Sequence, residues 1–145
     1  MPEPLPLRSA LITDAAEIAR LTKQLGYPSP PEAIRERLER LTVLDEYFVC
    51  VATGETGLVG WIAAEHRLLL EYGDRVEIVG LVVDEAARRG GVGKALVAAV
   101  EAWTRSRGQR HIAVRSNVVR EASHPFYERL GFMRSKTQHV YSRTL

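Results

Sequence analysis

The chain has 145 residues, 46% of them hydrophobic, which suffices for one domain with its own core. A single cysteine, Cys50, excludes a disulfide framework. No apolar run reaches the roughly 18 residues that span a bilayer, and the N-terminus lacks a signal-peptide pattern. We therefore expect a cytoplasmic protein that binds no membrane. The net charge of +2 is too small to indicate a nucleic-acid partner by itself.

The first half of the chain is predicted to contain three strands and two helices. Asp14 and Glu17 have the spacing of a capping box, and the apolar residues that follow recur at helical intervals up to Gly26. A second helix begins with prolines, which are tolerated in a first turn. The predicted elements are a strand over 5–12, helices over 14–25 and 30–41, and a β-hairpin of strands over 47–52 and 58–70.

The second half is organised around a strand that is apolar at nearly every position, which predicts that both of its faces are covered. The predicted elements are this strand over 76–83, a helix over 92–107, a strand over 111–116, a helix ending at Gly131 and a closing strand over 136–143. The strands on either side of the crossover helix are expected to be parallel. The sum is one α+β domain over residues 1–145, with a mixed sheet that is antiparallel in its first half, one parallel crossover, and about four flanking helices.

A glycine-rich basic turn lies between the central strand and its helix. A helix N-terminus leaves backbone N–H groups unpaired and carries about half a positive charge, so this position suits a phosphate. The glycines let a ligand approach the backbone, and the arginines and the lysine add charge. The turn consists of Arg88, Arg89, Gly90, Gly91, Val92, Gly93 and Lys94.

Two common phosphate-binding motifs do not fit this turn. A P-loop requires glycine where Arg88 stands and Ser or Thr where Ala95 stands, so the ATPase interpretation fails at both places. A dinucleotide fingerprint matches at Gly91 and Gly93 but has Leu96 at its third glycine position. A different phosphate ligand is therefore indicated.

The pattern that does fit is R-x-x-G-x-G, at Arg88, Gly91 and Gly93. It resembles the acetyl-CoA pyrophosphate loop of the GNAT superfamily of N-acetyltransferases. A second segment, residues 117–132 (NVVREASHPFYERLGF), resembles that superfamily's other cofactor segment, in which a tyrosine-bearing helix is followed by Gly-Phe. The order and spacing of the two segments also agree with the family, so the resemblance implies a GNAT-like fold whose two parallel strands splay apart to admit the cofactor.

The resemblance implies acetyl-CoA as co-substrate and assigns contacts to it. Its pantetheine amides are expected to pair with the backbone of Leu81, Val82 and Val83, as an extended ligand pairs with a strand edge. Gly80 either hosts a bulge that frees these groups or is kept small for helix packing. The second segment is expected to contribute Asn117, Ser123, Phe126 and Tyr127. With Arg88, Arg89 and Gly90 nearby, the pyrophosphate is expected on the N–H groups of Gly91, Val92, Gly93, Lys94 and Ala95.

Amide formation requires a neutral amine and a stabilised leaving thiolate. Tyr127 matches the family's tyrosine, whose implied role is hydrogen-bond donor or acid to the CoA sulfur. A free phenol, with a pKa of about 10, is a weaker acid than a thiol, with a pKa of about 8.5, so a strong hydrogen bond to the thiolate is the minimum role. The structural alternative is a core tyrosine beside Phe126.

Glu77 is the candidate base. Its position resembles that of the glutamate that many superfamily members use, often through a water molecule, to take the proton from the amine. Alternation along the strand puts it on one face with Val79, Leu81 and Val83, so it either borders a partly open site or is a surface carboxylate at the start of the strand.

The preceding strand offers further candidates. Glu65, His66 and Glu71 are alternative bases, or together with Asp74 and Glu77 they simply make the acceptor pocket acidic, which suggests a cationic amine. The four histidines show no ligand spacing, so no metal is expected.

The resemblance implies direct attack of the acceptor within a ternary complex. The segment around Arg120 and Tyr127 is similar to that of small-amine acetyltransferases, including aminoglycoside-modifying ones, which favours a small-molecule primary amine. The alternatives are a protein or peptide amine and a non-catalytic acyl-CoA-binding member. A further alternative is an RNA-binding module, suggested by the clustered arginines, although the chain lacks the interleaved aromatic residues of single-strand binders. These arginines are Arg88 and Arg89, and Arg105, Arg107 and Arg110. Similar proteins are often homodimers, and the closing strand offers an edge for a second copy.

Overall fold

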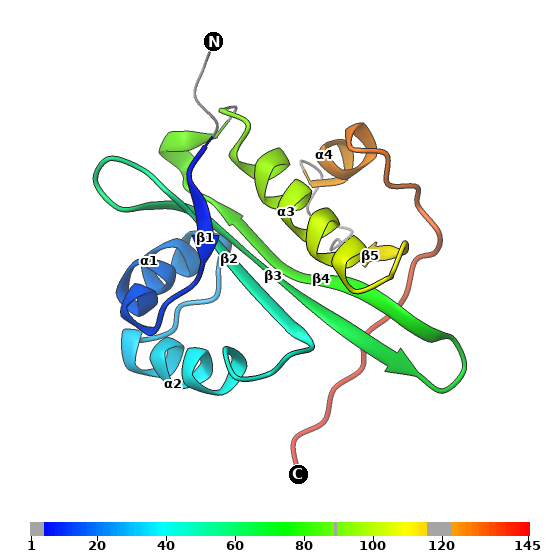
Figure 1. Ribbon diagram of the computed structural model, residues 1–145. Coiled ribbons are helices and arrows are strands. Elements are labelled where there is room, and N and C mark those ends of the chain that lie inside the picture. The colour runs from blue at the N-terminus through cyan, green and yellow to red at the C-terminus, as the bar shows by residue number, and fades with distance from the viewer. Residues whose placement is uncertain (1–4, 89, 116–122) are drawn as a thin grey trace. The chain divides into compact units, whose positions relative to one another are not determined.

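The protein divides into two compact units, Met1–Val114 and Arg115–Leu145 (Figure 1). The structure is a computed structural model that describes residues 5–88, 90–115 and 123–145. In these ranges no helix is long and apolar enough to cross a membrane. The second unit contains α4 (Ser123–Arg129). The first unit contains β1 (Leu7–Ser9), the 3-10 turn η1 (Ile12–Asp14), α1 (Ala15–Leu25), α2 (Pro31–Leu41), β2 (Tyr47–Thr53), β3 (Leu58–Leu69), β4 (Gly73–Val83), the 3-10 turn η2 (Glu85–Ala87), α3 (Val92–Ser106) and β5 (Ile112–Val114).

The first unit is built on one sheet with the strand order β1-β2-β3-β4-β5 (Figure 1). Neighbouring strands are antiparallel as far as β4, whereas β4 and β5 are parallel and are joined through α3. Such a connection is needed because parallel strands cannot be linked by a tight turn. The predicted α+β class, with a mixed sheet and one parallel crossover, is confirmed.

Helices cover both faces of this sheet. Trp61 on β3 packs against the core that α1 and α2 form with the sheet, whereas the neighbouring Gly60 faces α3. Successive strand residues point to opposite faces, so α3 lies across the sheet from α1 and α2 (Figure 1). Leu96, Val97 and Val100 of α3 are at most 1% exposed, so this face of the helix packs against the sheet.

The first helix forms where the sequence predicts it, but through different contacts. The carboxylate of Asp14 accepts the Leu11 N–H at 2.7 Å and two hydrogen bonds from Arg8, at 2.7 and 2.8 Å. Glu17 accepts the N–H of Leu58 at 3.0 Å rather than reaching back to the start of the helix. The capping-box prediction is therefore wrong, because β1 and β3 bring partners that the local spacing does not reveal.

The two predicted terminal strands also differ from the structure. β1 is only three residues long, because η1 begins at Ile12. The expected closing strand over 136–143 is wrong, since this segment has no regular secondary structure. Its apolar residues Val140 and Tyr141 are 86% and 91% exposed, and a lone strand without a partner gains nothing from an extended conformation.

A β-bulge interrupts β4. Ile78 pairs with Ala64 of β3, but the next pair joins Gly80 to Ala63, so Val79 is an extra residue on β4. A bulge of this kind bends its strand and shifts the side-chain alternation by one position.

The shifted alternation changes which residues share a face. Beyond the bulge, Leu81 and Val83 lie on the face opposite to Glu77, so the predicted common face is wrong. Of the two interpretations of Gly80, a neighbouring bulge is confirmed, but helix packing is not the reason for its small size. A side-chain carbon at Gly80 would lie 2.7 Å from the indole of Trp61.

Candidate functional site

The first turn of α3 presents a set of backbone donors that have no acceptor among the described residues. Gly91 begins the helix with a φ of 80°, a left-handed conformation that favours glycine. In the part of the chain that the structure describes, no acceptor partners the N–H groups of Gly91, Val92, Gly93 or Lys94. The Ala95 N–H instead donates to the Gly91 carbonyl at 3.0 Å, so the expectation that this fifth amide is free is wrong. Four N–H groups at a 15-residue helix terminus suit an anion.

The edge of β4 that faces away from β3 is open beyond the bulge. β5 pairs with β4 only from Val76 to Ile78, and no other strand among the described residues pairs with this edge. The Asp84 N–H donates to the Val59 carbonyl on β3 at 2.8 Å. In an antiparallel pair the backbone groups of successive residues point alternately toward and away from the neighbouring strand, so this bond shows which residues of β4 point toward β3. The backbone groups of Val82 therefore face β3.

The same alternation turns other backbone groups toward the open edge. The N–H and C=O groups of Leu81 and Val83 face away from β3, where an extended ligand can pair with them. Val82, which was expected to contribute as well, has its backbone groups inside the sheet. The bulge at Val79 decides this outcome, because without it Val82 would face outward and its two neighbours inward.

Contacts from α1 hold the connection between β4 and α3. Arg20 Nη1 donates to Asp84 Oδ2 at 3.0 Å, and Gln24 accepts the N–H of Glu85 at 3.0 Å. Asp84 also accepts the N–H of Ala86 at 3.1 Å. That bond and the paired guanidinium lower the pKa of the Asp84 carboxyl. Helix α1 thus fixes the path of the chain just before the four free donors.

Glu77 is buried, at 5% exposure, so the alternative of a surface carboxylate is wrong. Its Oε2 lies 3.1 Å from Arg67 Nη1, and its Oε1 lies 3.4 Å from Arg75 Nη2. It also pairs with Glu65 across the β3–β4 ladder. Two acidic and two basic side chains thus share one part of the sheet, and their charges balance. The acidic acceptor pocket expected from the sequence is offset by Arg67 and Arg75.

Glu65 and His66 have partners of their own. The Tyr47 O–H donates to Glu65, and this bond together with burial raises the pKa of Tyr47 to about 12. Arg107 donates Nε–H to His66 Nδ1 at 2.8 Å, so this geometry places the ring proton on Nε2, which lies 2.8 Å from Asp74 Oδ1. Both ring nitrogens are engaged, which disfavours His66 as a base.

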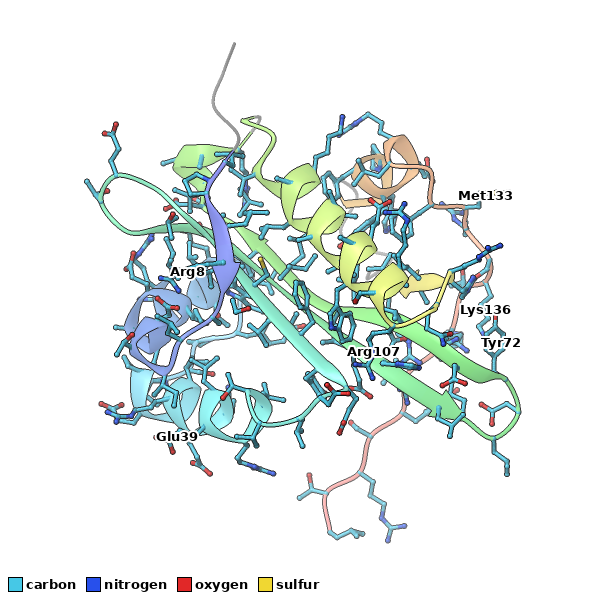
Figure 2. The ribbon with its side chains drawn as sticks, viewed as in Figure 1. Arg8, Glu39, Tyr72, Arg107, Met133 and Lys136 are labelled. Atoms are coloured by element: carbon cyan, nitrogen blue, oxygen red, sulfur yellow. The ribbon has the colours of Figure 1, made fainter. Side chains whose placement is uncertain are left out.

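Arg107 itself serves the fold. It lies at the end of α3 beside the β3–β4 hairpin (Figure 2), where it stacks 5.1 Å above the ring of Trp103 and donates to the carbonyl of Asp45 at 2.9 Å. One member of the arginine cluster that suggested RNA binding is thus committed to internal contacts. Glu71, the remaining alternative base, is exposed at the tip of that hairpin.

The second unit holds the candidate acid. Tyr127 of α4 packs edge to face against Phe126, with ring centroids 5.1 Å apart, and against Phe132 at 5.7 Å. Its ring is half-buried between these neighbours. α4 begins at Ser123, which places Pro125 in its first turn, where proline is tolerated. Aromatic packing on two sides restricts the phenol, as a group that must meet a reacting atom requires.

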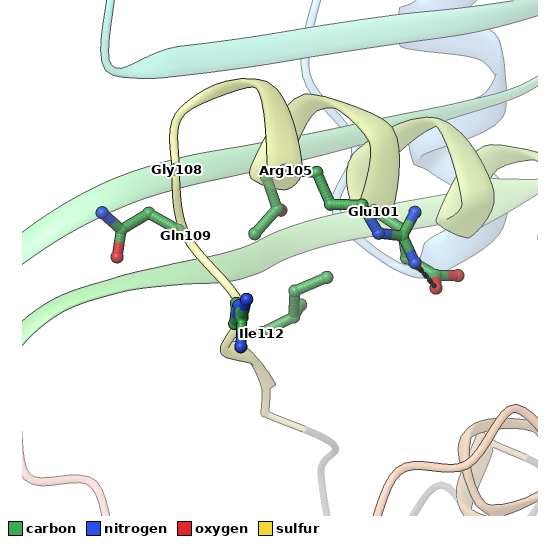
Figure 3. Close-up of a pocket in the computed structure, with 7 residues that line it drawn as sticks. Glu101, Arg105, Gly108, Gln109 and Ile112 are labelled. Carbon is green, nitrogen blue, oxygen red and sulfur yellow. Dashed lines mark ion pairs between the residues drawn. The ribbon is translucent and has the colours of Figure 1, made fainter.

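A cavity of about 590 Å³ lies between the end of α3 and β5 (Figure 3). Its lining includes Arg105 and Glu101, which form an ion pair at 3.7 Å. It lies at the opposite end of α3 from the free donors, and a 15-residue helix is about 22 Å long. We therefore do not assign it to the phosphate ligand. Among the predicted contacts, Arg89 and Asn117 lie outside the described residues.

Comparison with known proteins decides the family. The profile of the Acetyltransferase (GNAT) family matches residues 12–132. The chain belongs to this family. It is 34% identical over 134 residues to aminoglycoside N(6')-acetyltransferase type 1 of Stenotrophomonas maltophilia, covering 87% of this chain and 84% of that one. It is 32% identical over 137 residues to glucosamine 6-phosphate N-acetyltransferase 1 of Oryza sativa subsp. japonica, covering 86% and 81%.

The GNAT fold is also found among solved structures. The aminoglycoside N-acetyltransferase AAC(6')-Iy, in complex with CoA, superposes with a TM-score of 0.87 at 24% identity, over 98% of this chain and 96% of that one. A Trypanosoma brucei acetyltransferase superposes with a TM-score of 0.79 at 26% identity, over 97% and 100%. This GNAT chain is an acetyl-CoA-dependent N-acetyltransferase.

Sequence reasoning missed the residues that support the GNAT site from other elements. The pairs of Arg20 with Asp84 and of Arg67 with Glu77 join residues that are 64 and 10 positions apart. Such polar residues on amphipathic elements look like solvent-facing ones. Strand register brings Arg67 to Glu77, and the packing of α1 against the sheet brings Arg20 to Asp84.

Proposed function

We propose that this chain transfers the acetyl group of acetyl-CoA to a primary amine of a small molecule, by direct attack in a ternary complex. The observation that carries the proposal is the set of four N–H donors at the α3 terminus, which have no acceptor among the described residues and follow the open edge of β4 after a short connection. The donors suit the pyrophosphate of acetyl-CoA, with Arg88 and Lys94 exposed beside them. Leu81 and Val83 suit the pantetheine amides.

We assign the proton transfers to Glu77 and Tyr127. The lone pair of the amine forms the C–N bond to the thioester carbonyl carbon, and the C–S bond breaks. The proton lost by the nitrogen passes to Glu77 through a water molecule, because both carboxylate oxygens already face guanidinium groups. The leaving thiolate accepts a hydrogen bond from the Tyr127 hydroxyl.

The relatives support a small-molecule acceptor. Both curated relatives are named for amino-sugar substrates, an aminoglycoside and glucosamine 6-phosphate. The chain covers more than four fifths of the length of each. A protein or peptide acceptor has no comparable support.

Thermal-shift titration with acetyl-CoA, followed by a thiol-release assay over a panel of amines, tests the proposal. We expect saturable stabilisation by acetyl-CoA and thiol release with at least one small amine. Lys94→Ala should weaken acetyl-CoA binding about three- to tenfold, since a charge-assisted contact to phosphate is lost. Arg40→Ala, at an exposed position in the last turn of α2, is the matched control and should leave binding unchanged. Binding without thiol release from any amine would instead indicate a non-catalytic acyl-CoA-binding member.

A further inference from the structure

A second cavity, of about 190 Å³, lies on the face of the sheet that α1 and α2 cover. Its walls are largely aliphatic, with Ile18 from α1, Ile34, Leu38 and Leu41 from α2, and Val49 and Ala63 from the sheet. An engineered cavity of about 150 Å³ with similar walls is large enough to bind benzene. This cavity therefore has room for an aromatic ring or an alkyl group of that size.

The polar groups around this cavity offer little to a polar ligand. Thr22 Oγ1 already donates to the Ile18 carbonyl at 2.6 Å, and Arg37 Nη1 already donates to Ser29 Oγ at 3.2 Å. Trp61 Nε1 is enclosed by protein atoms and has no hydrogen-bond partner among the described residues. A hydroxyl group placed against the aliphatic walls, away from Thr22 and Arg37, would go unpaired, at a cost that lowers affinity about tenfold or more.

The cavity adjoins the candidate base. Val49 pairs with Ala63, which pairs with Gly80, and these three residues form one row across the sheet face. The next row on the same face contains Tyr47, Glu65 and Glu77. Rows on one face are two residues apart, about 7 Å along the strand. A group in the cavity with a two-carbon linker thus brings an amine to the row of Glu77.

We propose that this cavity receives an apolar group of the acceptor. The preferred substrates are then primary amines that carry an uncharged apolar group about the size of an aromatic ring, and polyhydroxylated amino sugars are poor substrates. This specificity departs from the substrates named for the two curated relatives. The inference rests on the proposed acetyl transfer, but the cavity's preference for a ring can be measured without any reaction.

Fluorescence of Trp61, which lines the cavity, measures binding directly. The chain has two tryptophans, so the variant Trp103→Phe leaves Trp61 as the only reporter. We expect 2-phenylethylamine, with saturating CoA present, to change this fluorescence saturably and to bind at least about tenfold more tightly than ethanolamine. An aminoglycoside should give no saturable change. Equal affinities for 2-phenylethylamine and ethanolamine would overturn the inference.

Filling the cavity supplies a test by activity. Ala63→Leu, or Leu41→Phe from the α2 side should the first variant fail to fold, is expected to reduce the preference for 2-phenylethylamine over ethanolamine in thiol release to about one. Ala98→Leu, on the exposed face of α3, is the matched control and should retain the preference. Thiol release that favours ethanolamine or an amino sugar would refute the inference and leave the proposed function standing. Absence of thiol release from every amine would refute the proposed function, and the fluorescence titration would still decide whether the cavity binds the ring.

Discussion

The substitution Gly60→Ala tests whether the packing of α3 on the sheet sets the phosphate donors. A methyl group at Gly60 would lie 2.9 Å from the carbonyl oxygen of Val82, 3.0 Å from Val92 Cγ1 and 3.1 Å from Leu96 Cδ1. Each contact is a few tenths of an ångström shorter than ordinary van der Waals contact, which begins at 3.4 Å. The contact with the backbone carbonyl strains the pairing of β3 with β4. The contacts with Val92 and Leu96 push the first turn of α3 away from the sheet.

This displacement has two expected costs. Overpacking should lower the free energy of unfolding by about 1–3 kcal/mol, as measured by urea denaturation. The free N–H groups of the first turn would shift relative to the edge of β4, so the Kd for acetyl-CoA should rise about three- to tenfold, which corresponds to roughly 0.7–1.4 kcal/mol. Isothermal titration calorimetry measures that change.

Gly80→Ala is the matched control for this prediction. Its methyl group would lie 2.7 Å from the indole of Trp61, on the opposite face of the sheet and away from α3. It should cost a similar amount of stability, about 1–3 kcal/mol, with little change in the Kd for acetyl-CoA. If Gly60→Ala lost stability and yet bound acetyl-CoA with the wild-type Kd, the assignment of the phosphate site to the α3 terminus would be refuted.

Three further predictions concern the proton transfers and the stability of the fold. Tyr127→Phe should lower kcat by about 10²–10⁴ with little change in the Kd for acetyl-CoA, and wild-type turnover would remove Tyr127 from the mechanism. Glu77→Gln should lower kcat by a similar factor, whereas Glu65→Gln, the control on the adjacent strand, should lower it less; equal losses would contradict the choice of base. Hydrogen bonds from Arg8 hold the pKa of Asp14 below its ordinary value, so its stabilising contribution is complete above about pH 4 and is lost as the pH falls through the lower pKa of the folded state. Urea denaturation of wild type and Asp14→Asn should then differ at pH 7 and converge as the pH falls below about 4, and a difference that stayed constant down to low pH would rule out the pair as its source.

Local sequence patterns predicted the strand, the turn and the helix around the candidate phosphate site. The apolar run before Val83 and the helical spacing after Val92 depend only on neighbouring residues, and both elements form where they were predicted. The glycine at the start of α3 has the left-handed conformation that glycine adopts most easily. These features were predictable because each follows from interactions within a few residues.

The bulge in β4 was not predictable, and it changed the site most. One extra residue, Val79, moves Glu77 and Leu81 to opposite faces and turns the backbone of Val82 into the sheet. Nothing in the local sequence requires this, because the bulge depends on how β3 pairs with β4. The register between β3 and β4 likewise determines the partners of Glu77, because Arg67 donates to it from the neighbouring strand.

The amino-acid sequence by itself determined the α+β class, the crossover and the basic glycine turn, since periodicity, glycine and helix-terminal charge act over short distances along the chain. The tertiary structure alone decided which amides of that turn are free, which strand residues face the open edge, and that an apolar cavity adjoins Glu77. Those outcomes depend on pairing between β3 and β4 and on the helices that cover each face, and such long-range contacts are fixed only when the whole core packs.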